Sequence, residues 1–388
     1  MQSFGAYIAV LQDEFGWSAT ALSAAFAIQQ ATGGFLGPVI GWLVQRLGPR
    51  LIIRSGLIIF CGGLLLLSTI STLAGLYTSV VVIALGAALA GFLPLNTVAV
   101  QWFSRWRSTA LALMQTGISL AGFAVPLVAW ALVTYGWRVT AVATGTIVFA
   151  LGIPLTFAIG NRPEDYGLLP DGGPSKRLAA KQITPTNPGR DFTAREALET
   201  RAFWFISFGH SLALAVVFSV LAHVIIYLTG ERGFSLQSAS LIVTLMTSAS
   251  IVGQLTGGFL GDRLNKRFMA VGAMFGHALG LLLLTYGPGL VSVLSFALVH
   301  GLAWGVRGPI MQAIRADYFG RTNFGQIMGY SSVIVTLGMV GGPLFAGLLA
   351  DIFGSYRWGF TALATLAGLG SIFFVFSTPP REPVAGSQ

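Results

Sequence analysis

Four residues of one apolar segment have side chains that could bind a small charged molecule. His300, Trp304, Arg307 and Met311 recur at i, i+4, i+7 and i+11, which places them on one face of a helix. A guanidinium can hold a carboxylate through two parallel hydrogen bonds, and a titratable ring and an aromatic wall suit the same ligand. The spacing therefore predicts a site for a small organic anion. The alternative is structural: Arg307 extends toward the membrane surface or binds carbonyls freed by Pro309.

Other polar side chains could complete this site. All 13 carboxylates fall in expected loops or at the ends of expected spans, so a histidine could carry a coupled proton, with His223 and His300 favoured. The alternative is a charge in the missing part of the first span. Each histidine could instead be a packed ring bonded to backbone. The further binding candidates, which could equally join helices by hydrogen bonds, are Tyr7, Asn96, His223, Tyr227 and Gln254.

The sequence shows no pattern typical of an enzyme. It has no metal-ligand cluster, no phosphate-binding loop and no nucleophile paired with a base, so we expect no catalytic residues, no metal and no cofactor. A membrane-embedded enzyme would need acids or a metal set at one depth. A channel or a signalling receptor is a third alternative.

Composition indicates which elements must position these residues. Charged residues make up 9% of the 388-residue chain and hydrophobic residues 54%, whereas roughly a quarter of a typical soluble domain is charged. The chain is therefore expected to be an all-α, polytopic membrane protein in contact with the lipid bilayer. Its net charge of +9 is better explained by orientation in the membrane than by nucleic acid.

Runs of about 20 apolar residues are long enough to cross the hydrocarbon core. A half-length run, Met1–Leu11, precedes eleven such runs. The eleven are Ala19–Val44, Leu51–Ser71, Leu73–Val100, Ser108–Thr134, Thr140–Ile159, Ala202–Leu228, Leu236–Gly261, Phe268–Tyr286, Leu290–Ala313, Asn323–Ala350 and Trp358–Ser377.

Basic residues predict the orientation of the chain, because lysine and arginine gather in cytoplasmic loops. One set of alternate loops holds 18 of them, Arg315 included, and the other holds Arg138, Arg232 and Arg357. Arg307 is left as the single formal charge inside a span. The central loop and the C-terminus are thus expected to be cytoplasmic, in a plasma or inner membrane.

The chain contains an internal repeat. Gly41–Arg50 aligns with Gly258–Arg267 at an offset of 217 residues, and the same offset maps Gly16-Trp17-Ser18 onto Gly233-Phe234-Ser235. We therefore expect two pseudo-symmetric six-helix bundles. The expected domains are an N-terminal bundle (1–160), a cytoplasmic linker (161–200), a C-terminal bundle (201–379) and a cytoplasmic tail (380–388).

Two further patterns concern the end of the linker and the start of the chain. Thr193-Ala-Arg-Glu196 has the Thr-x-x-Glu capping pattern, which predicts a short helix before the seventh span.

The 217-residue offset places about 16 residues of the first helix before Met1, so we favour a misplaced start over a genuine truncation. Upstream sequence should then encode further apolar residues in frame, and an immediate stop codon would contradict this.

From the Gly41–Arg50 loop onward, the sequence resembles the major facilitator superfamily. The family's hallmark between spans two and three, Gly-x-Leu-x-Asp-Arg-x-Gly-x-Arg, is present here with Gln45 in place of aspartate, and the second copy keeps Asp262. The resemblance implies a substrate held near the midplane between the halves. It also implies a gating latch made by Gln45, Arg46, Arg50, Asp262, Arg263 and Arg267.

Finer motifs are similar to one branch of that family. Phe15-Gly-Trp-Ser18, Thr200-Arg-Ala-Phe-Trp204 and Ala316-Asp-Tyr-Phe-Gly320 resemble oxalate/formate antiporters and monocarboxylate transporters. We therefore expect a monomeric secondary transporter that moves a small organic anion or monocarboxylate by alternating access, with a co-transported proton or a counter-anion. The alternative is a facilitator-type transporter of a drug or a neutral metabolite.

Overall fold

The apolar runs of the sequence form helices throughout the described chain. The computed structural model describes residues 4–172, 191–381 and 383, which are helical and contain no strand. Nine helical segments within these ranges are long and apolar enough to cross a membrane, judged by length and composition. A helix bonds its own backbone groups, which a segment surrounded by lipid requires. The all-α membrane fold expected from composition is confirmed.

The chain divides into two compact units. The first unit comprises Met1–Trp102 and Gly117–Ile183, and the second comprises Phe103–Thr116 and Thr184–Gln388. The two units are described separately below.

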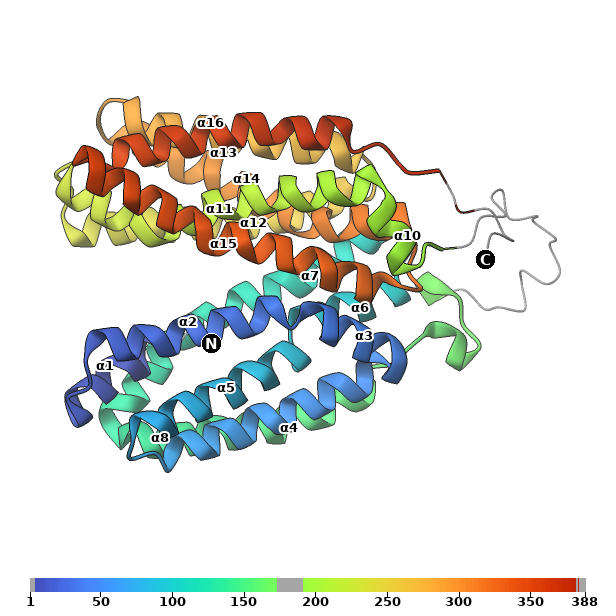
Figure 1. Ribbon diagram of the computed structural model, residues 1–388, viewed down its shortest axis with the longest axis horizontal. Coiled ribbons are helices and arrows are strands. Elements are labelled where there is room, and N and C mark those ends of the chain that lie inside the picture. Colours follow the sequence, from blue (N-terminus) through green and yellow to red (C-terminus); the bar gives the residue numbers. More distant parts are fainter. Residues whose placement is uncertain (1–3, 173–190, 382, 384–388) are drawn as a thin grey trace. The chain divides into compact units, whose positions relative to one another are not determined.

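Helices of the first unit lie beside one another in pairs (Figure 1). Its α-helices are α1 (Phe4–Phe15), α2 (Ala19–Phe35), α3 (Gly37–Leu47), α4 (Pro49–Ser68), α5 (Leu73–Ala90), α6 (Phe92–Trp102) and α8 (Val125–Leu155), with short 3-10 turns at Ala121–Ala124, Thr156–Ala158, Pro163–Tyr166 and Pro170–Gly172. Helix α4 packs against α5 and α8. A Cβ on Gly86 would lie 2.3 Å from the backbone nitrogen of Phe60, so this glycine allows α4 and α5 to approach closely.

Two expected spans of the first unit are each broken into two helices. A third break lies within α8, between the expected spans Ser108–Thr134 and Thr140–Ile159. The run Ala19–Val44 divides at Leu36, where α3 begins at Gly37 with Pro38 in its first turn, and the run Leu73–Val100 divides at Gly91. Within α8, Gly136 has a φ of 78°, which ends one helical segment and starts the next. Proline lacks a backbone donor and glycine tolerates positive φ, so these breaks lie where the backbone chemistry favours them.

The second unit is a bundle of long helices (Figure 1). Its elements are the start of α7 (Arg107–Leu120), α10 (Ala194–Glu199), α11 (Arg201–Gly230), α12 (Leu236–Gly261), α13 (Lys266–Tyr286), α14 (Gly289–Phe319), α15 (Phe324–Phe353) and α16 (Tyr356–Phe376). Helix α14 packs against α12 and α13, and α11 packs against α15 and α16. The capping box predicted at Thr193 and Glu196 is confirmed at the start of α10.

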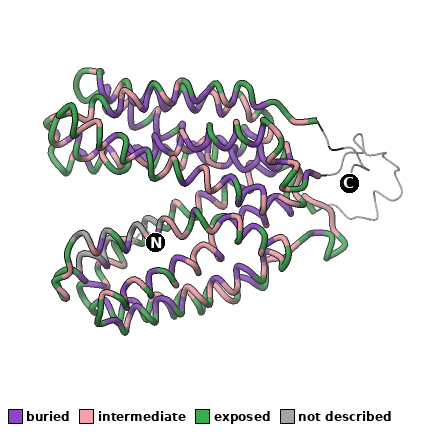
Figure 2. Tube along the Cα trace, viewed as in Figure 1, coloured by how far each residue is buried: buried purple, intermediate pink, exposed green. Residues whose placement is uncertain are grey.

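Apolar side chains cover both the inside and the outside of these helices. Figure 2 shows buried positions along the inward faces of the second unit and exposed positions along its outer faces. Leu241 and Leu344 are 64% and 68% exposed, and many other large apolar side chains are exposed along the same helices. Apolar surface of this extent is compatible with lipid and not with water.

Glycines set the spacing between α12 and α14. A Cβ on Gly305 would lie 1.9 Å from the carbonyl oxygen of Ser250, and one on Gly253 would lie 2.5 Å from that of Leu302. Both atoms belong to backbone, so neither can move aside without moving a helix. Small residues at such positions let membrane helices approach closely. This contact fixes the part of α14 that precedes Arg307.

The substitution Gly305→Ala is therefore expected to destabilise the protein. Overpacking typically costs about 1–3 kcal/mol, and a backbone obstacle places this case at the upper end. The thermal unfolding midpoint of the purified protein in detergent should fall by several degrees. The matched control is Gly272→Ala on α13, where a Cβ would meet nothing within 4 Å. An unchanged midpoint for Gly305→Ala would contradict the packing account.

Candidate functional site

Arg307 is a buried cation without a described counter-ion. It lies in α14 and is 1% exposed. Its Nε and Nη1 atoms have no hydrogen-bond partner among the described residues. A buried charge is costly unless it is paired and hydrogen-bonded, so such a group calls for a negatively charged partner. The guanidinium of Arg307 is thus a candidate anion-binding group.

The residues expected to share a face with Arg307 do lie on one continuous helix. His300 is fully buried, Met311 is fully buried, and Trp304 is half-buried against the apolar core of the second unit. His300 also has a partner that its sequence spacing did not indicate, because its Nδ1 lies 3.3 Å from Nδ1 of His277 on α13. This face of α14 therefore combines the guanidinium of Arg307 and the imidazole of His300 with the large side chains of Trp304 and Met311.

A second buried arginine, Arg315, lies eight residues after Arg307 on the same helix. Arg315 was assigned to a loop, but α14 continues to Phe319, and Arg315 is 1% exposed within it. Its Nη1 donates to the Met311 carbonyl (2.6 Å), and its Nη2 donates to His210 Nδ1 (3.1 Å) and Ser331 Oγ (2.8 Å). The helix ends later than expected because its stop is Gly320, with a φ of 83°.

The remaining binding candidates of the second unit each have a contact of their own. His223 donates from Nε2 to the Pro343 carbonyl at 3.0 Å, so this ring is bonded to backbone. Tyr227 is buried and its ring packs edge-on against Phe360. Gln254 accepts a hydrogen bond from Thr116 at 3.2 Å.

The two candidates of the first unit are both buried. Tyr7 lies in α1 and is 5% exposed. Asn96 lies in α6, is fully buried, and donates from Nδ2 to the Phe92 carbonyl at 2.6 Å, one turn earlier in the chain. This bond lies within α6, so it does not join α6 to another helix.

Asp262, among the expected gating residues, caps a helix. Its carboxylate accepts hydrogen bonds from the backbone N–H of Ser108 (2.7 Å), the backbone N–H of Thr109 (3.0 Å) and the Thr109 hydroxyl (2.6 Å). These groups belong to the first turn of α7, where unpaired N–H groups and the helix dipole favour a negative charge. Asp262 follows α12 directly, so it ties the end of α12 to the start of α7 within the second unit.

Basic side chains surround this cap. The Arg263 guanidinium lies 3.5 Å from the centre of the Phe259 ring and 5.5 Å from that of Trp106. Arg267 lies 4.8 Å from the centre of the Phe268 ring. Nearby, Asp317 pairs with Arg107 (2.5 Å) and Lys266 (2.7 Å), which links α14 to the starts of α7 and α13. Sequence reasoning missed Asp317, because its partners lie about 50 and 210 positions away in the chain.

The first copy of the hallmark loop has a different chemistry. Arg46 stacks on Trp42 at 5.3 Å, and Arg50 lies 5.7 Å from the centre of the Phe157 ring. The backbone N–H of Arg50 donates to Asn161 Oδ1 at 3.0 Å. Gln45 stands in α3 where the second copy has its aspartate. The amide side chain supplies no negative charge to a helix start.

A linker aspartate that sequence reasoning also missed caps the turn before α15. Asp191 Oδ2 accepts from the backbone N–H of Thr322 (2.8 Å), the Thr322 hydroxyl (2.6 Å) and the backbone N–H of Arg321 (3.0 Å). By the 217-residue offset, the symmetry mate of the α7 start is the start of α15. A carboxylate therefore caps both the start of α7 and the turn before α15. The first belongs to Asp262 and the second to Asp191, which come from different parts of the chain.

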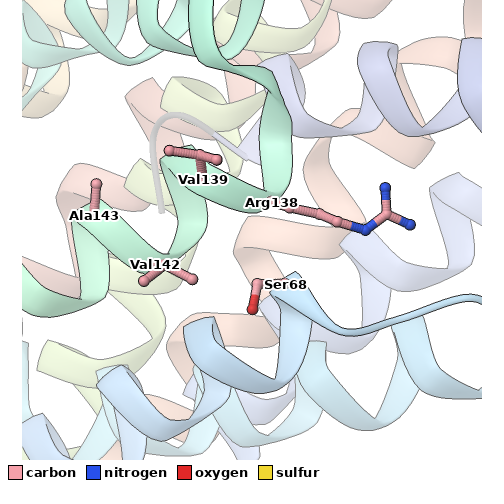
Figure 3. A pocket seen from close by; sticks show the side chains of 5 residues that line it. All are labelled: Ser68, Arg138, Val139, Val142 and Ala143. Carbon is pink, nitrogen blue, oxygen red and sulfur yellow. The ribbon is translucent and has the colours of Figure 1, made fainter.

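A shallow groove in the first unit lies apart from these residues. It has a volume of about 340 Å³ and is lined by Ser68 of α4 and by Arg138, Val139, Val142 and Ala143 of α8 (Figure 3). Figure 3 shows the Arg138 guanidinium pointing away from the two valines. It binds Glu14 at 2.6 Å, and this bond, with one from Trp137, lowers the pKa of the Glu14 carboxyl. Apart from Ser68 and Arg138 the groove is lined by apolar side chains, so it offers few polar groups to a ligand.

The described residues define a polytopic helical membrane protein with a buried cationic face. The sequence model of the Major Facilitator Superfamily matches residues 1–241 and 203–388, which together span the chain. The protein belongs to this superfamily, as its hallmark loops indicated. It is therefore an integral multi-pass membrane protein and a secondary transporter of a small molecule, not an enzyme.

Individual relatives are distant but extend over nearly the whole chain. Monocarboxylate transporter 13 of Bos taurus is 25% identical over 397 residues, covering 99% of this chain and 88% of that protein. The hexuronate transporter of Escherichia coli K12 is 24% identical over 392 residues, covering 96% and 87%. The structure of the proton:xylose symporter XylE aligns with a TM-score of 0.74 at 15% identity, covering 97% and 92%, and this likeness shows the fold alone.

Proposed function

We propose that this secondary transporter moves a small organic anion, such as a monocarboxylate, by alternating access, with Arg307 as the group that binds the carboxylate. The observation that supports this most is the complete burial of Arg307 with Nε and Nη1 unpaired among the described residues. A carboxylate would supply both charge and two acceptors in the geometry that a guanidinium fork matches.

The identity of distant relatives supports the same substrate class. Two relatives that align along nearly the whole chain have names that state an acidic substrate, a monocarboxylate in one case and a hexuronate in the other. Buried ionisable groups in membrane proteins usually mark substrate or ion pathways. Asp262 and its basic neighbours would act as the gating latch, and His300 and Trp304 would line the bound anion.

Uptake into proteoliposomes tests this proposal. Radiolabelled lactate, pyruvate, oxalate, glucuronate, xylose and a neutral amino acid should be compared, with and without a pH gradient. We expect saturable uptake of at least one carboxylate that exceeds that into protein-free vesicles at least tenfold, and no saturable uptake of xylose. Transport of xylose with none of the carboxylates would favour the neutral-metabolite alternative.

We also propose that the central linker and the C-terminus face the cytoplasm, because basic residues concentrate in that set of loops. An impermeant maleimide should then label Glu199→Cys in inside-out vesicles and Arg357→Cys in right-side-out vesicles, each in a Cys61→Ala background. The reverse labelling pattern would contradict this orientation.

A further inference from the structure

Two arginines at the start of α4 contact the same aromatic ring. Arg50 and Arg54 are one helical turn apart, so their side chains lie on one face of α4. The Arg54 guanidinium lies 4.4 Å from the centre of the Phe157 ring, and that of Arg50 lies 5.7 Å from it. Phe157 belongs to the 3-10 turn that follows α8, and α8 lies beside α4 (Figure 1). We call Arg50, Arg54 and Phe157 the α4 basic cluster.

Hydrogen bonds hold the α4 basic cluster in place but leave two of its donors unused. Arg54 Nε donates to the Thr156 hydroxyl (3.1 Å), and the backbone N–H of Arg50 donates to Asn161 Oδ1 (3.0 Å). Arg54 Nη2 and Arg50 Nε are buried and have no hydrogen-bond partner among the described residues. A buried donor of a charged group costs free energy when it is unpaired, so both atoms call for an acceptor.

The two positive charges of the cluster also lack a counter-ion. Within residues 4–172 and 191–381, no ion pair or hydrogen bond joins Arg50 or Arg54 to a carboxylate. The helix dipole does not compensate for this, because the start of a helix is its positive end. Residues 173–190 of the linker contain no aspartate or glutamate that could supply the charge. An external anion is therefore the partner that the cluster calls for.

Exposed apolar side chains adjoin the cluster in the chain. Phe157 is 62% exposed, Leu155 is 68% exposed and Leu51 is 48% exposed. Just after the 3-10 turn, the Gly160 carbonyl accepts a hydrogen bond from Trp102 Nε1 at 2.8 Å. Arginines and a tryptophan next to exposed apolar surface are typical of the level at which lipid headgroups meet the hydrocarbon core. The cluster is thus expected to meet lipid rather than bulk water.

An anionic phospholipid satisfies both requirements of the cluster. Guanidinium groups bind phosphate through parallel hydrogen bonds, and two of them offer donors to more than one phosphate oxygen. Anionic headgroups also attract arginines at the membrane surface. Acyl chains can cover the exposed rings and leucines, which a free anion cannot do.

We propose that Arg50, Arg54 and Phe157 form a binding site for one anionic phospholipid. The two guanidiniums hold its phosphate, and Phe157 packs against the beginning of its acyl chains. The site lies within the first unit and shares no residue with the Arg307 face. It is therefore independent of the proposed function and of the transported substrate.

Binding of labelled phosphatidylglycerol to the purified protein in a neutral detergent tests this proposal. We expect saturable binding to the wild type, and at least about tenfold weaker binding to Arg50→Gln/Arg54→Gln. Phosphatidylcholine with the same acyl chains carries no net charge and should bind the wild type at least about tenfold more weakly. Millimolar inorganic phosphate should not displace the lipid. Displacement would indicate a site for free phosphate and would overturn the lipid assignment.

A second double variant separates this site from the general effect of positive charge. Arg195→Gln/Arg201→Gln removes the same formal charge from two exposed side chains of α10 and α11. This control should bind phosphatidylglycerol with wild-type affinity. Equal weakening in the two double variants would overturn the site, and so would wild-type affinity in Arg50→Gln/Arg54→Gln.

Two further measurements guard against a folding defect. Phosphatidylglycerol should raise the thermal unfolding midpoint of the wild type and leave that of Arg50→Gln/Arg54→Gln unchanged. Because Phe157 is largely exposed, Phe157→Ala should unfold at the wild-type midpoint in the absence of lipid. It should nevertheless bind phosphatidylglycerol about threefold more weakly, since the ring orients both guanidiniums. Wild-type lipid affinity in Phe157→Ala would contradict the proposed site.

Discussion

The variant Arg307→Gln should lose saturable carboxylate uptake, with an apparent affinity at least about hundredfold below that of the wild type. Charged hydrogen bonds contribute about 1.5–3 kcal/mol each, so losing a two-bond fork costs roughly 3 kcal/mol or more, and 1.4 kcal/mol corresponds to tenfold. Arg307→Lys keeps the charge but loses the fork, so we expect an intermediate loss of about tenfold. Initial rates of uptake against substrate concentration measure both values.

The structural alternative for Arg307 predicts a different outcome. If its guanidinium served only to bind carbonyls near Pro309, then Arg307→Gln would lower the thermal unfolding midpoint and leave the affinity unchanged. The matched control is Arg232→Gln, since Arg232 donates to the carbonyls of Leu284 (3.3 Å) and Gly287 (2.7 Å). This control should show the structural pattern. The same pattern in Arg307→Gln would contradict an anion-binding role.

The variant Asp262→Asn should slow turnover about tenfold while the affinity for substrate stays near that of the wild type. The carboxylate of Asp262 accepts three hydrogen bonds at the start of α7, and the amide has one acceptor oxygen and no charge. Losing a charged helix cap costs about 1–2 kcal/mol, which alters the population of the capped state by roughly five- to thirtyfold. Steady-state exchange kinetics separate the maximal rate from the apparent affinity.

A similar cap elsewhere provides the control for Asp262. Asp191 also accepts three hydrogen bonds, but they come from Arg321 and Thr322 in the turn between α14 and α15 and not from α7. Asp191→Asn should lower stability by a similar amount with turnover near that of the wild type. Equal losses of turnover in both variants would argue against a specific latch at Asp262.

The helices could be predicted from the sequence because their signal is local. Each expected apolar run is largely helical where the structure describes it, with breaks at Leu36 and Gly91, and the start of α10 follows from its capping box. The expected run ends at Ala313 and leaves Arg315 in a loop, whereas α14 continues to Phe319. The burial of Arg315 depends on His210 and Ser331, which lie 105 and 16 positions away and leave no mark in the α14 sequence.

The candidate site could be predicted only in part, for the same reason. The spacing of His300, Trp304 and Arg307 on one helix is a local property, and α14 places them as expected. The pairing of His277 with His300 joins residues 23 positions apart through the packing of two helices, with glycines that resemble many others in the chain. Likewise, the contact of Asp262 with the start of α7 requires tertiary packing, so the hallmark loop suggested the residue but not its partner.

The central claim is that Arg307 recognises the negative charge of the substrate. Equilibrium binding of a carboxylate and of its primary amide, such as lactate and lactamide, tests this most directly, because the two have nearly the same shape and differ in charge. For the transported acid, we expect saturable binding to the purified wild-type protein, at least hundredfold weaker binding of the amide, and no distinction between the two in Arg307→Gln. Equal binding of the acid and the amide to the wild type would contradict the claim.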